Sequence, residues 1–177
     1  CFKNWADILT EENIKNWLSE YQVSQISKKV GLILAGNIPL VGFHDVMCVI
    51  LSNHIPLIKL SSKDRLLLPF FLKKWGEFSE WNLEFQIVER LTEYDAVIAT
   101  GSNNTARYLE YYFKDALSII RKNRTSVAVI KGDETDEELQ LLAEDIFRYF
   151  GLGCRNVTRL LIPKDYELSR LFENFLG

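Results

Sequence analysis

The sequence is poor in the residues that build disulfide frameworks and metal sites. Its 177 residues include three cysteines and two histidines, with no C-x-x-C pair and no Cys/His cluster. Widely spaced thiols indicate a reducing compartment, so we expect a cytoplasmic protein with no metal site. A chain of this length buries roughly 70% of its surface on folding and needs neither disulfides nor a structural metal.

Charge of one sign and long apolar runs are also scarce. Lys and Arg number 21 against 24 Asp and Glu, which gives a formal net charge of −3 at pH 7. The basic residues are scattered, so no electrostatic surface for nucleic acid or an anionic membrane is expected. Polar residues interrupt the longest apolar stretch before the ~20 residues that a membrane-spanning helix needs. We therefore expect a soluble globular protein.

The beginning of the chain shows no processing signal. It reads Cys1-Phe2-Lys3, without an initiator Met and without the charged-then-apolar pattern of a signal peptide. We therefore expect the sequence to be a fragment of a longer protein.

Short apolar runs alternate with segments of helical length along most of the chain. Strands are predicted at the start of 29–39 and at 55–60, 85–88, 94–100, 126–130 and 158–162. Helices are predicted at 40–53, from 61 to about 75, at 103–113 and from 135 onward. Parallel neighbours need crossovers of ten or more residues, usually helical. The fold class is therefore α/β, a parallel sheet flanked by helices.

Local signals fix several helix ends. Ser61, Ser62 and Asp64 are predicted to start the second helix, with Pro69 starting or kinking it. A capping box at Thr135 opens the last predicted helix. Its apolar stripe comprises Leu139, Leu142, Ile146 and Phe150. Gly151 then stands where a left-handed residue is expected.

Cys154 is the best nucleophile candidate. It lies in the glycine-containing loop 151–156, between a predicted helix and a predicted strand, and the adjacent Arg155 favours the thiolate. The competing interpretation is a small buried cysteine that fills a gap in the core. Cys48 lies in an apolar helix and is read as structural, and Cys1 as an exposed chain end.

Two turns follow buried strands, where α/β proteins place ligand-binding groups. Asn37 follows the first strand, and its amide is able either to stabilise an oxyanion or to bond its own turn. Gly101-Ser102 opens the third helix and offers backbone N–H groups to an anion such as pyrophosphate. His44 and His54 have no second titratable partner nearby in sequence, so surface or helix-face roles are expected for them.

Four segments, in this order and spacing, resemble one known family. They are GNIPLVGFHD at 36–45, IKLSSKD at 58–64, ATGSNNTARY at 99–108 and EDIFRYFGLGCRNVTRL at 144–160. Together they resemble the acyl-CoA reductases of the bioluminescence fatty-acid-reductase type (LuxC-like), a branch of the aldehyde dehydrogenase superfamily. The resemblance covers nearly the whole chain after about Asp7. It implies a Rossmann-like NAD(P)-binding region at 1–118 and the beginning of a catalytic domain at 119–177.

The resemblance assigns roles to individual residues. Cys154 matches the catalytic cysteine that accepts the acyl group, and Asn37 matches the asparagine whose amide holds the thioester oxygen. Lys59 matches the lysine that contacts the adenosine ribose. Gly101-Ser102 matches the turn beside the pyrophosphate, with Thr105 and Arg107 close enough to contribute.

Three positions depart from the superfamily pattern. Ile120 takes the place of the general-base glutamate, so no carboxylate activates water there, which suits reduction of an acyl-enzyme. Ser62 replaces an acidic residue that binds the ribose hydroxyls in NAD-specific relatives. A small neutral residue leaves room for a 2′-phosphate, so NADPH is favoured and NADH stays open. Leu152 replaces the glutamine before the cysteine.

The resemblance implies an NAD(P)H-dependent oxidoreductase that reduces a fatty acyl-CoA to an aldehyde. The isolated fragment is expected to bind the cofactor without catalysing the reaction. Two alternatives stay open: an acyl-phosphate or semialdehyde reductase of the same superfamily, and a non-catalytic dinucleotide-binding protein. Homo-oligomers and an acyl-transferring partner enzyme are also left open.

Overall fold

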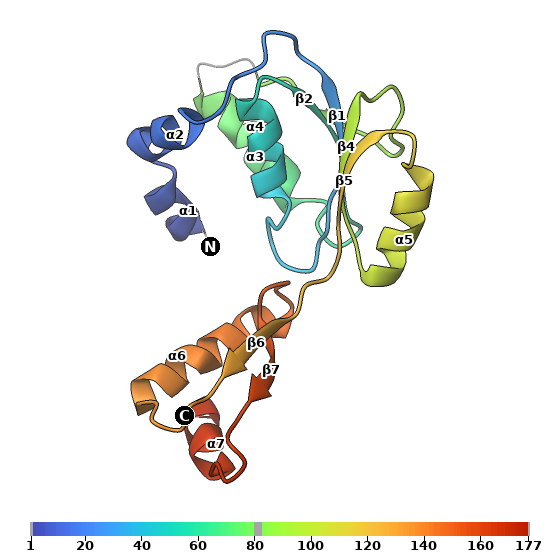
Figure 1. Cartoon of the computed structure of the whole chain (residues 1–177). Helices are drawn as coiled ribbons and strands as arrows, with labels where there is room; N and C mark the ends of the chain where they lie inside the picture. Colours follow the sequence, from blue (N-terminus) through green and yellow to red (C-terminus); the bar gives the residue numbers. More distant parts are fainter. Residues whose placement is uncertain (1, 80–82, 177) are drawn as a thin grey trace.

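The protein forms two lobes, each with its own sheet. The computed structural model describes residues 2–79 and 83–176. Figure 1 shows a large N-terminal lobe (residues 2–121) above a small C-terminal lobe (residues 126–176), joined by the segment that follows the last strand of the upper sheet. Among the described residues, no helix combines the length and the apolarity that crossing a membrane requires.

A five-stranded parallel sheet forms the centre of the large lobe. Its strands are β1 (Lys29–Ile33), β2 (Ile55–Lys59), β3 (Gln86–Ile87), β4 (Ala96–Thr100) and β5 (Leu117–Arg121). Their order is β3-β2-β1-β4-β5, and every pair in it is parallel. From β1 the chain adds β2 and then β3 on one side. It then crosses back over β1 and adds β4 and β5 on the other side. This confirms the predicted α/β class with a parallel sheet.

Helices cover both faces of this sheet. α3 (Phe43–Leu51) and α4 (Leu67–Phe78) lie on one side, and α5 (Asn103–Tyr112) lies on the other (Figure 1). The first side holds the larger core, in which Leu32, Val46 and Leu72 are fully buried. Apolar strands of this kind are buried on both faces, which explains why their sequences are nearly continuous apolar runs.

Two short helices that the sequence pattern did not indicate precede the sheet. They are α1 (Phe2–Ile8) and α2 (Glu11–Leu18), the second capped by Thr10. They are anchored by tryptophans: the Trp5 ring lies 5.3 Å from that of Phe43 in an edge-to-face contact, and Trp17 packs against the same core. Tertiary contacts therefore stabilise these two helices. A segment of seven or eight residues is too short for its apolar periodicity to predict a helix from the sequence.

The small lobe pairs two parallel strands with two helices. β6 (Ser126–Val129) lies beside β7 (Val157–Leu161), and α6 (Asp136–Phe147), a 3-10 turn η1 (Arg148–Gly151) and α7 (Leu168–Leu176) complete it. Ile130, Leu139 and Leu171 are its buried core. The predicted capping box is confirmed, since the Glu138 N–H donates to Thr135 Oγ1 and the Glu138 carboxylate accepts from the Thr135 N–H.

Two expectations about local structure are wrong. The second helix starts at Leu67 rather than at the Ser61–Asp64 stretch, because Asp64 instead accepts the Leu40 N–H at 3.3 Å and holds a loop. Pro69 lies in its first turn, where a missing N–H breaks no helical bond. Phe150 does not continue the apolar stripe of α6, because the chain leaves the helix at Arg148 and Phe150 is 96% exposed with φ 57°.

The strand β5 was not anticipated, and it bears on the division of the chain. Leu117–Arg121 pairs with β4 along its whole length. A boundary between 118 and 119 therefore lies inside β5, and the upper sheet ends at Arg121. The alternating exposure of β5, an edge strand, explains the weak apolar signal.

Candidate functional site

The predicted ligand-binding turns meet at one edge of the upper sheet. β1 and β4 are neighbours whose crossovers run in opposite directions, and the carboxyl ends of both strands lie level in register, with Ile33 opposite Ala99. Such a reversal opens a crevice at the carboxyl edge of a parallel sheet, where α/β proteins bind ligands. Asn37 follows β1 and Gly101-Ser102 follows β4, so the sheet brings both predicted turns to this crevice.

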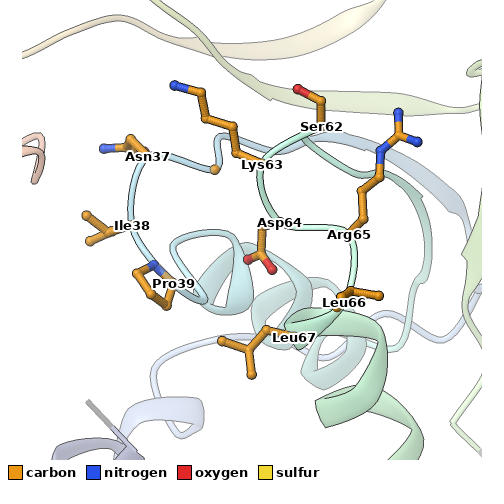
Figure 2. A pocket seen from close by; sticks show the side chains of 10 residues that line it. Asn37, Ile38, Pro39, Ser62, Lys63, Asp64, Arg65, Leu66 and Leu67 are labelled. Atoms are coloured by element: carbon orange, nitrogen blue, oxygen red, sulfur yellow. The ribbon is translucent and has the colours of Figure 1, made fainter.

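Asn37 lies beside a cavity of about 490 Å³ between the β1–α3 loop and the β2–α4 loop. Figure 2 shows Asn37 on one rim, with Ser62, Lys63 and Arg65 across from it. The loops approach closely because residue 36 is a glycine: a Cβ there would lie 2.4 Å from Ser61 Oγ. This packing holds both loops at the sheet edge.

The residues expected on the ribose side of a cofactor come from the end of β2 and the loop after it. Lys59 is the last residue of that strand, its side chain is exposed, and its carbonyl oxygen accepts the Leu34 N–H at 3.2 Å. Ser62 lines the cavity. Two cations that sequence reasoning passed over, Lys63 and Arg65, line it as well, and neither has an ion-pair partner among the described residues.

The Gly101-Ser102 turn forms a complete helix start. Ser102 is the N-cap of α5: its Oγ accepts the Thr105 N–H at 3.2 Å and lies 2.9 Å from Thr105 Oγ1. A Cβ at Gly101 would lie 2.9 Å from the Thr105 Cβ, so the turn needs glycine for space. The first-turn N–H groups of α5 therefore face the crevice edge. Arg107, further along α5, is exposed.

Cys154 is exposed on a turn in the small lobe. The Asn156 N–H donates to the Gly153 carbonyl at 3.1 Å, so Cys154 and Arg155 are the two central residues of a β-turn. Gly151, with φ 68°, has the predicted left-handed conformation. The alternative of a buried, gap-filling cysteine is wrong for this residue, because the turn holds it away from the small-lobe core.

The structure brings Asn37 and the cysteine loop together across the two lobes. The Asn37 amide N–H donates to the carbonyl of Leu152, the residue that replaces the superfamily glutamine. Ile38, next to Asn37, lines a cavity of about 260 Å³ together with Cys154. Residues that are far apart in the sequence thus lie together, where the 151–156 loop of the small lobe meets the β1–α3 loop at the carboxyl edge of the upper sheet.

A second cavity, of about 330 Å³, connects Cys154 to the ends of β1, β4 and β5. Thr100 lines this cavity and pairs in register with Arg121 on the neighbouring strand β5. Its lining is strongly basic. The cationic residues are Arg121, Lys122, Arg124 and Arg155, and the single acidic one is Asp45.

Asp45 neutralises only one of these cations. It is buried in α3 and forms an ion pair with Arg121 at the end of β5. Lys122 pairs with Glu110 at 2.7 Å. Arg124 and Arg155 have no ion-pair partner within the described part of the chain. The cavity beside Cys154 therefore carries an excess of positive charge.

His44 is exposed on α3, as expected, but it does have titratable neighbours. Its Nδ1 lies 3.6 Å from Cys48 Sγ and 3.7 Å from the Asp45 carboxylate. Cys48 is half-buried, and burial together with the Asp45 charge raises the pKa of its thiol. One helical turn separates His44 from Cys48, which is the spacing that brings side chains together on a helix.

Comparison with known families decides the relationship of this chain. Residues 7–170 match the family described as acyl-CoA reductase (LuxC). The chain belongs to this acyl-CoA reductase family. No curated protein sequence matches the chain at a significant level.

Solved structures of aldehyde dehydrogenases share the fold of this LuxC-family chain. An aldehyde dehydrogenase C mutant from Pseudomonas syringae, complexed with NAD+ and octanal, superposes with a TM-score of 0.73 at 14% identity, over 92% of this chain and 38% of that one. An aldehyde dehydrogenase from Mycobacterium tuberculosis, complexed with NAD+, gives 0.69 at 17% identity, over 84% and 33%. The chain thus spans less than half the length of these enzymes.

A gamma-glutamyl-gamma-aminobutyraldehyde dehydrogenase from Burkholderia cenocepacia gives the same result, with a TM-score of 0.67 at 16% identity over 92% of this chain and 40% of that one. Identities this low establish the common fold. The LuxC-family chain therefore shares the fold of aldehyde dehydrogenases over most of its length.

Proposed function

We propose that the complete gene product reduces an acyl-CoA thioester to an aldehyde, using a reduced nicotinamide dinucleotide and an acyl group held on Cys154. The observation that carries this proposal is the position of Cys154. The thiol is exposed on a turn that the Asn37 amide ties to the carboxyl edge of the parallel sheet, next to the crevice between β1 and β4. Family membership supports the same reaction.

The groups at the crevice would suit a dinucleotide. Gly101 and Ser102 would hold the pyrophosphate at the start of α5, where the first-turn N–H groups of the helix favour an anion. Lys59 would contact the ribose from the end of β2. A bound reduced nicotinamide supplies the hydride that brings the acyl group to the aldehyde level.

The cavity beside the end of β2 supports NADPH over NADH. Ser62 is small and neutral, and Lys63 and Arg65 line the same cavity without ion-pair partners among the described residues. Two unpaired cations beside a small residue suit the 2′-phosphate of NADPH, whereas the ribose hydroxyls of NADH call for an acidic partner.

Cys154 would carry out the acyl transfer. Its thiolate attacks the carbonyl carbon of the thioester, a new C–S bond forms, and the bond to the CoA sulfur breaks, so that CoA leaves as a thiolate. One N–H of the Asn37 amide is bonded to Leu152, and an amide nitrogen has two. The second N–H would donate to the carbonyl oxygen as negative charge develops on it.

Ile120 supports reduction rather than hydrolysis of the acyl-enzyme. It lies on β5 next to Arg121 and carries no group that could take a proton from water. Without a carboxylate at position 120 to take a proton from water, the acyl-enzyme would persist long enough to be reduced.

A second acyl donor, an acyl phosphate, is favoured by one specific observation. Arg124 and Arg155 line the cavity that contains Cys154 and have no ion-pair partner in the described ranges. In an acyl phosphate, the leaving phosphate is bonded to the reacting carbonyl carbon through one oxygen. Cations this close to the cysteine suit that leaving group.

The deciding experiment measures NADPH consumption and aldehyde formation by the complete gene product. Acyl-CoA thioesters of several chain lengths and the matching acyl phosphates serve as donors, with Cys154→Ser as the test variant and Cys48→Ser as the matched control. We expect turnover with acyl-CoA that Cys154→Ser abolishes and Cys48→Ser retains. Turnover with acyl phosphate alone would show that acyl phosphate, and not acyl-CoA, is the donor. NADPH binding without any turnover would show a protein that binds the dinucleotide and catalyses no reduction.

The cofactor preference has its own test. We expect the double variant Lys63→Gln/Arg65→Gln to raise KM for NADPH about tenfold or more and to leave KM for NADH nearly unchanged. Lys28→Gln, at the opposite edge of the sheet, is the matched control and leaves both values unchanged. Equal effects on NADPH and NADH would contradict the assignment of the 2′-phosphate to this cavity.

A further inference from the structure

Asn156 is the buried polar side chain closest to Cys154 along the chain. It is 9% exposed, although it lies only two residues after the exposed cysteine. Buried asparagines are rarely tolerated unless their amide groups are bonded, so its partners show what it does.

The amide nitrogen of Asn156 binds the carboxyl end of helix α6. It donates to the carbonyl oxygens of Asp145, Ile146 and Arg148, at 3.0, 3.1 and 2.9 Å. The last carbonyls of a helix have no partner within the helix, and here a side chain from beyond the cysteine supplies one. An amide nitrogen has two hydrogens, so at least one is shared between acceptors.

The rest of the Asn156 residue holds the cysteine turn. Its backbone N–H donates to the Gly153 carbonyl at 3.1 Å and closes the turn that contains Cys154. Its side-chain oxygen occupies the space beside Gly153, where a Cβ would lie 2.2 Å away from it. One residue therefore fixes both the end of α6 and the turn.

The segment between those two points has an unusual backbone. Tyr149, Phe150 and Gly151 are consecutive residues with φ of 57°, 57° and 68°. Two non-glycine residues in the left-handed region are unfavourable and persist only where the surroundings hold them. The bonds from Asn156 bracket this segment, since they reach residues before it and close the turn after it.

We propose that Asn156 is a positioning residue for Cys154, which sets the thiol in place by clamping the turn to the end of α6. Asn37 bonds Leu152 from the large lobe, so the loop is held from both sides. The inference rests on the proposed function for its kinetic consequence, and it makes a separate structural prediction that needs no activity.

The test uses the complete gene product with Asn156→Ala. As the matched control, Asn174→Ala removes a part-buried amide of the same lobe, which donates to the Arg170 carbonyl at 3.0 Å away from the cysteine loop. We expect Asn156→Ala to lower kcat for thioester reduction about tenfold to a hundredfold per folded molecule, with KM for acyl-CoA and NADPH nearly unchanged. Asn174→Ala keeps kcat. Loss of kcat that follows the unfolded fraction alone would overturn the proposal.

Hydrogen exchange gives the second readout, which is independent of turnover. In Asn156→Ala, exchange should accelerate about tenfold or more in residues 147–156 and stay unchanged in β7 and α7. Acceleration throughout the small lobe, or none at all, would refute the positioning role. If Asn156→Ala does not fold, Gly153→Ala replaces it, because the added methyl group displaces the Asn156 oxygen while the amide remains. An inactive wild type with loop-specific exchange would reject the proposed function and keep the clamp.

Discussion

The ion pair between Asp45 and Arg121 joins helix α3 to the end of β5, and its two members differ in access to water. The Asp45 side chain is 8% exposed, and that of Arg121 is 38% exposed. Replacing Arg121 by Met leaves a buried carboxylate without its cation. Replacing Asp45 by Asn leaves a guanidinium that water still reaches. The two substitutions should therefore differ in cost although they break the same contact.

The size of the difference follows from this exposure. Breaking a fully buried pair costs about 3–5 kcal/mol, and access of water to Arg121 lowers that figure to about 2–4 kcal/mol for Arg121→Met. For Asp45→Asn we expect about 1 kcal/mol, the net contribution of a hydrogen bond. With a urea m-value of roughly 2 kcal/mol per M, Arg121→Met should lower the unfolding midpoint by about 1–2 M.

Tryptophan fluorescence in urea is the appropriate assay, because Trp5, Trp17 and Trp75 pack against the core of the large lobe and report on its unfolding. The double variant Asp45→Asn/Arg121→Met should recover part of the stability lost in Arg121→Met, since no buried charge is then left unpaired. An Arg121→Met protein as stable as Asp45→Asn, or a double variant no more stable than Arg121→Met, would refute this reasoning.

Three further predictions concern separate parts of the molecule. Iodoacetamide should modify the exposed Cys154 well before Cys48. Because burial raises the pKa of the Cys48 thiol, modification of Cys48 should need a higher pH. Mass spectrometry of the two cysteine-containing peptides measures both rates. Ser102→Ala should cost about 1 kcal/mol in urea unfolding and Ser102→Gly less, since the N-cap bond is lost. Leu139→Ala, at 0% exposure, should cost about 3 kcal/mol and accelerate hydrogen exchange in α6, whereas normal exchange there would contradict the assigned core.

The fold could be predicted well wherever the signal was local. The apolar runs of β1, β2 and β4 are continuous because these strands are buried on both faces, and that pattern survives in the sequence. The capping box at Thr135 and the cap at Ser102 depend on residues three positions apart, so they too could be read directly.

Prediction failed where a distant contact decided the structure. β5 is an edge strand with exposed Leu117 and Ile119, so it lacks the pattern of a buried strand and is defined by its pairing with β4. The Ser61–Asp64 stretch has the composition of a helix start, yet Asp64 bonds Leu40 on another loop. In both cases the tertiary partner outweighs the local preference.

The candidate site shows the same division. The chemical types were visible in the sequence: a cysteine in a glycine-containing loop, an amide after a buried strand, and a Gly-Ser turn before a helix. Lys63 and Arg65 follow Ser62 directly, so their positive charge was visible too, but only the cavity shows that it gathers around the same space.

The sequence by itself determined the family, the parallel α/β class and the residue types for the proposed chemistry, because these depend on composition, periodicity and short motifs. Only the tertiary structure decided that Asn37 meets the loop of Cys154, that Asp45 takes Arg121 as its partner, and that Asn156 clamps the end of α6. These contacts join residues from different elements, so their geometry exists only after each lobe has folded and, for Asn37 and Leu152, after the two lobes meet.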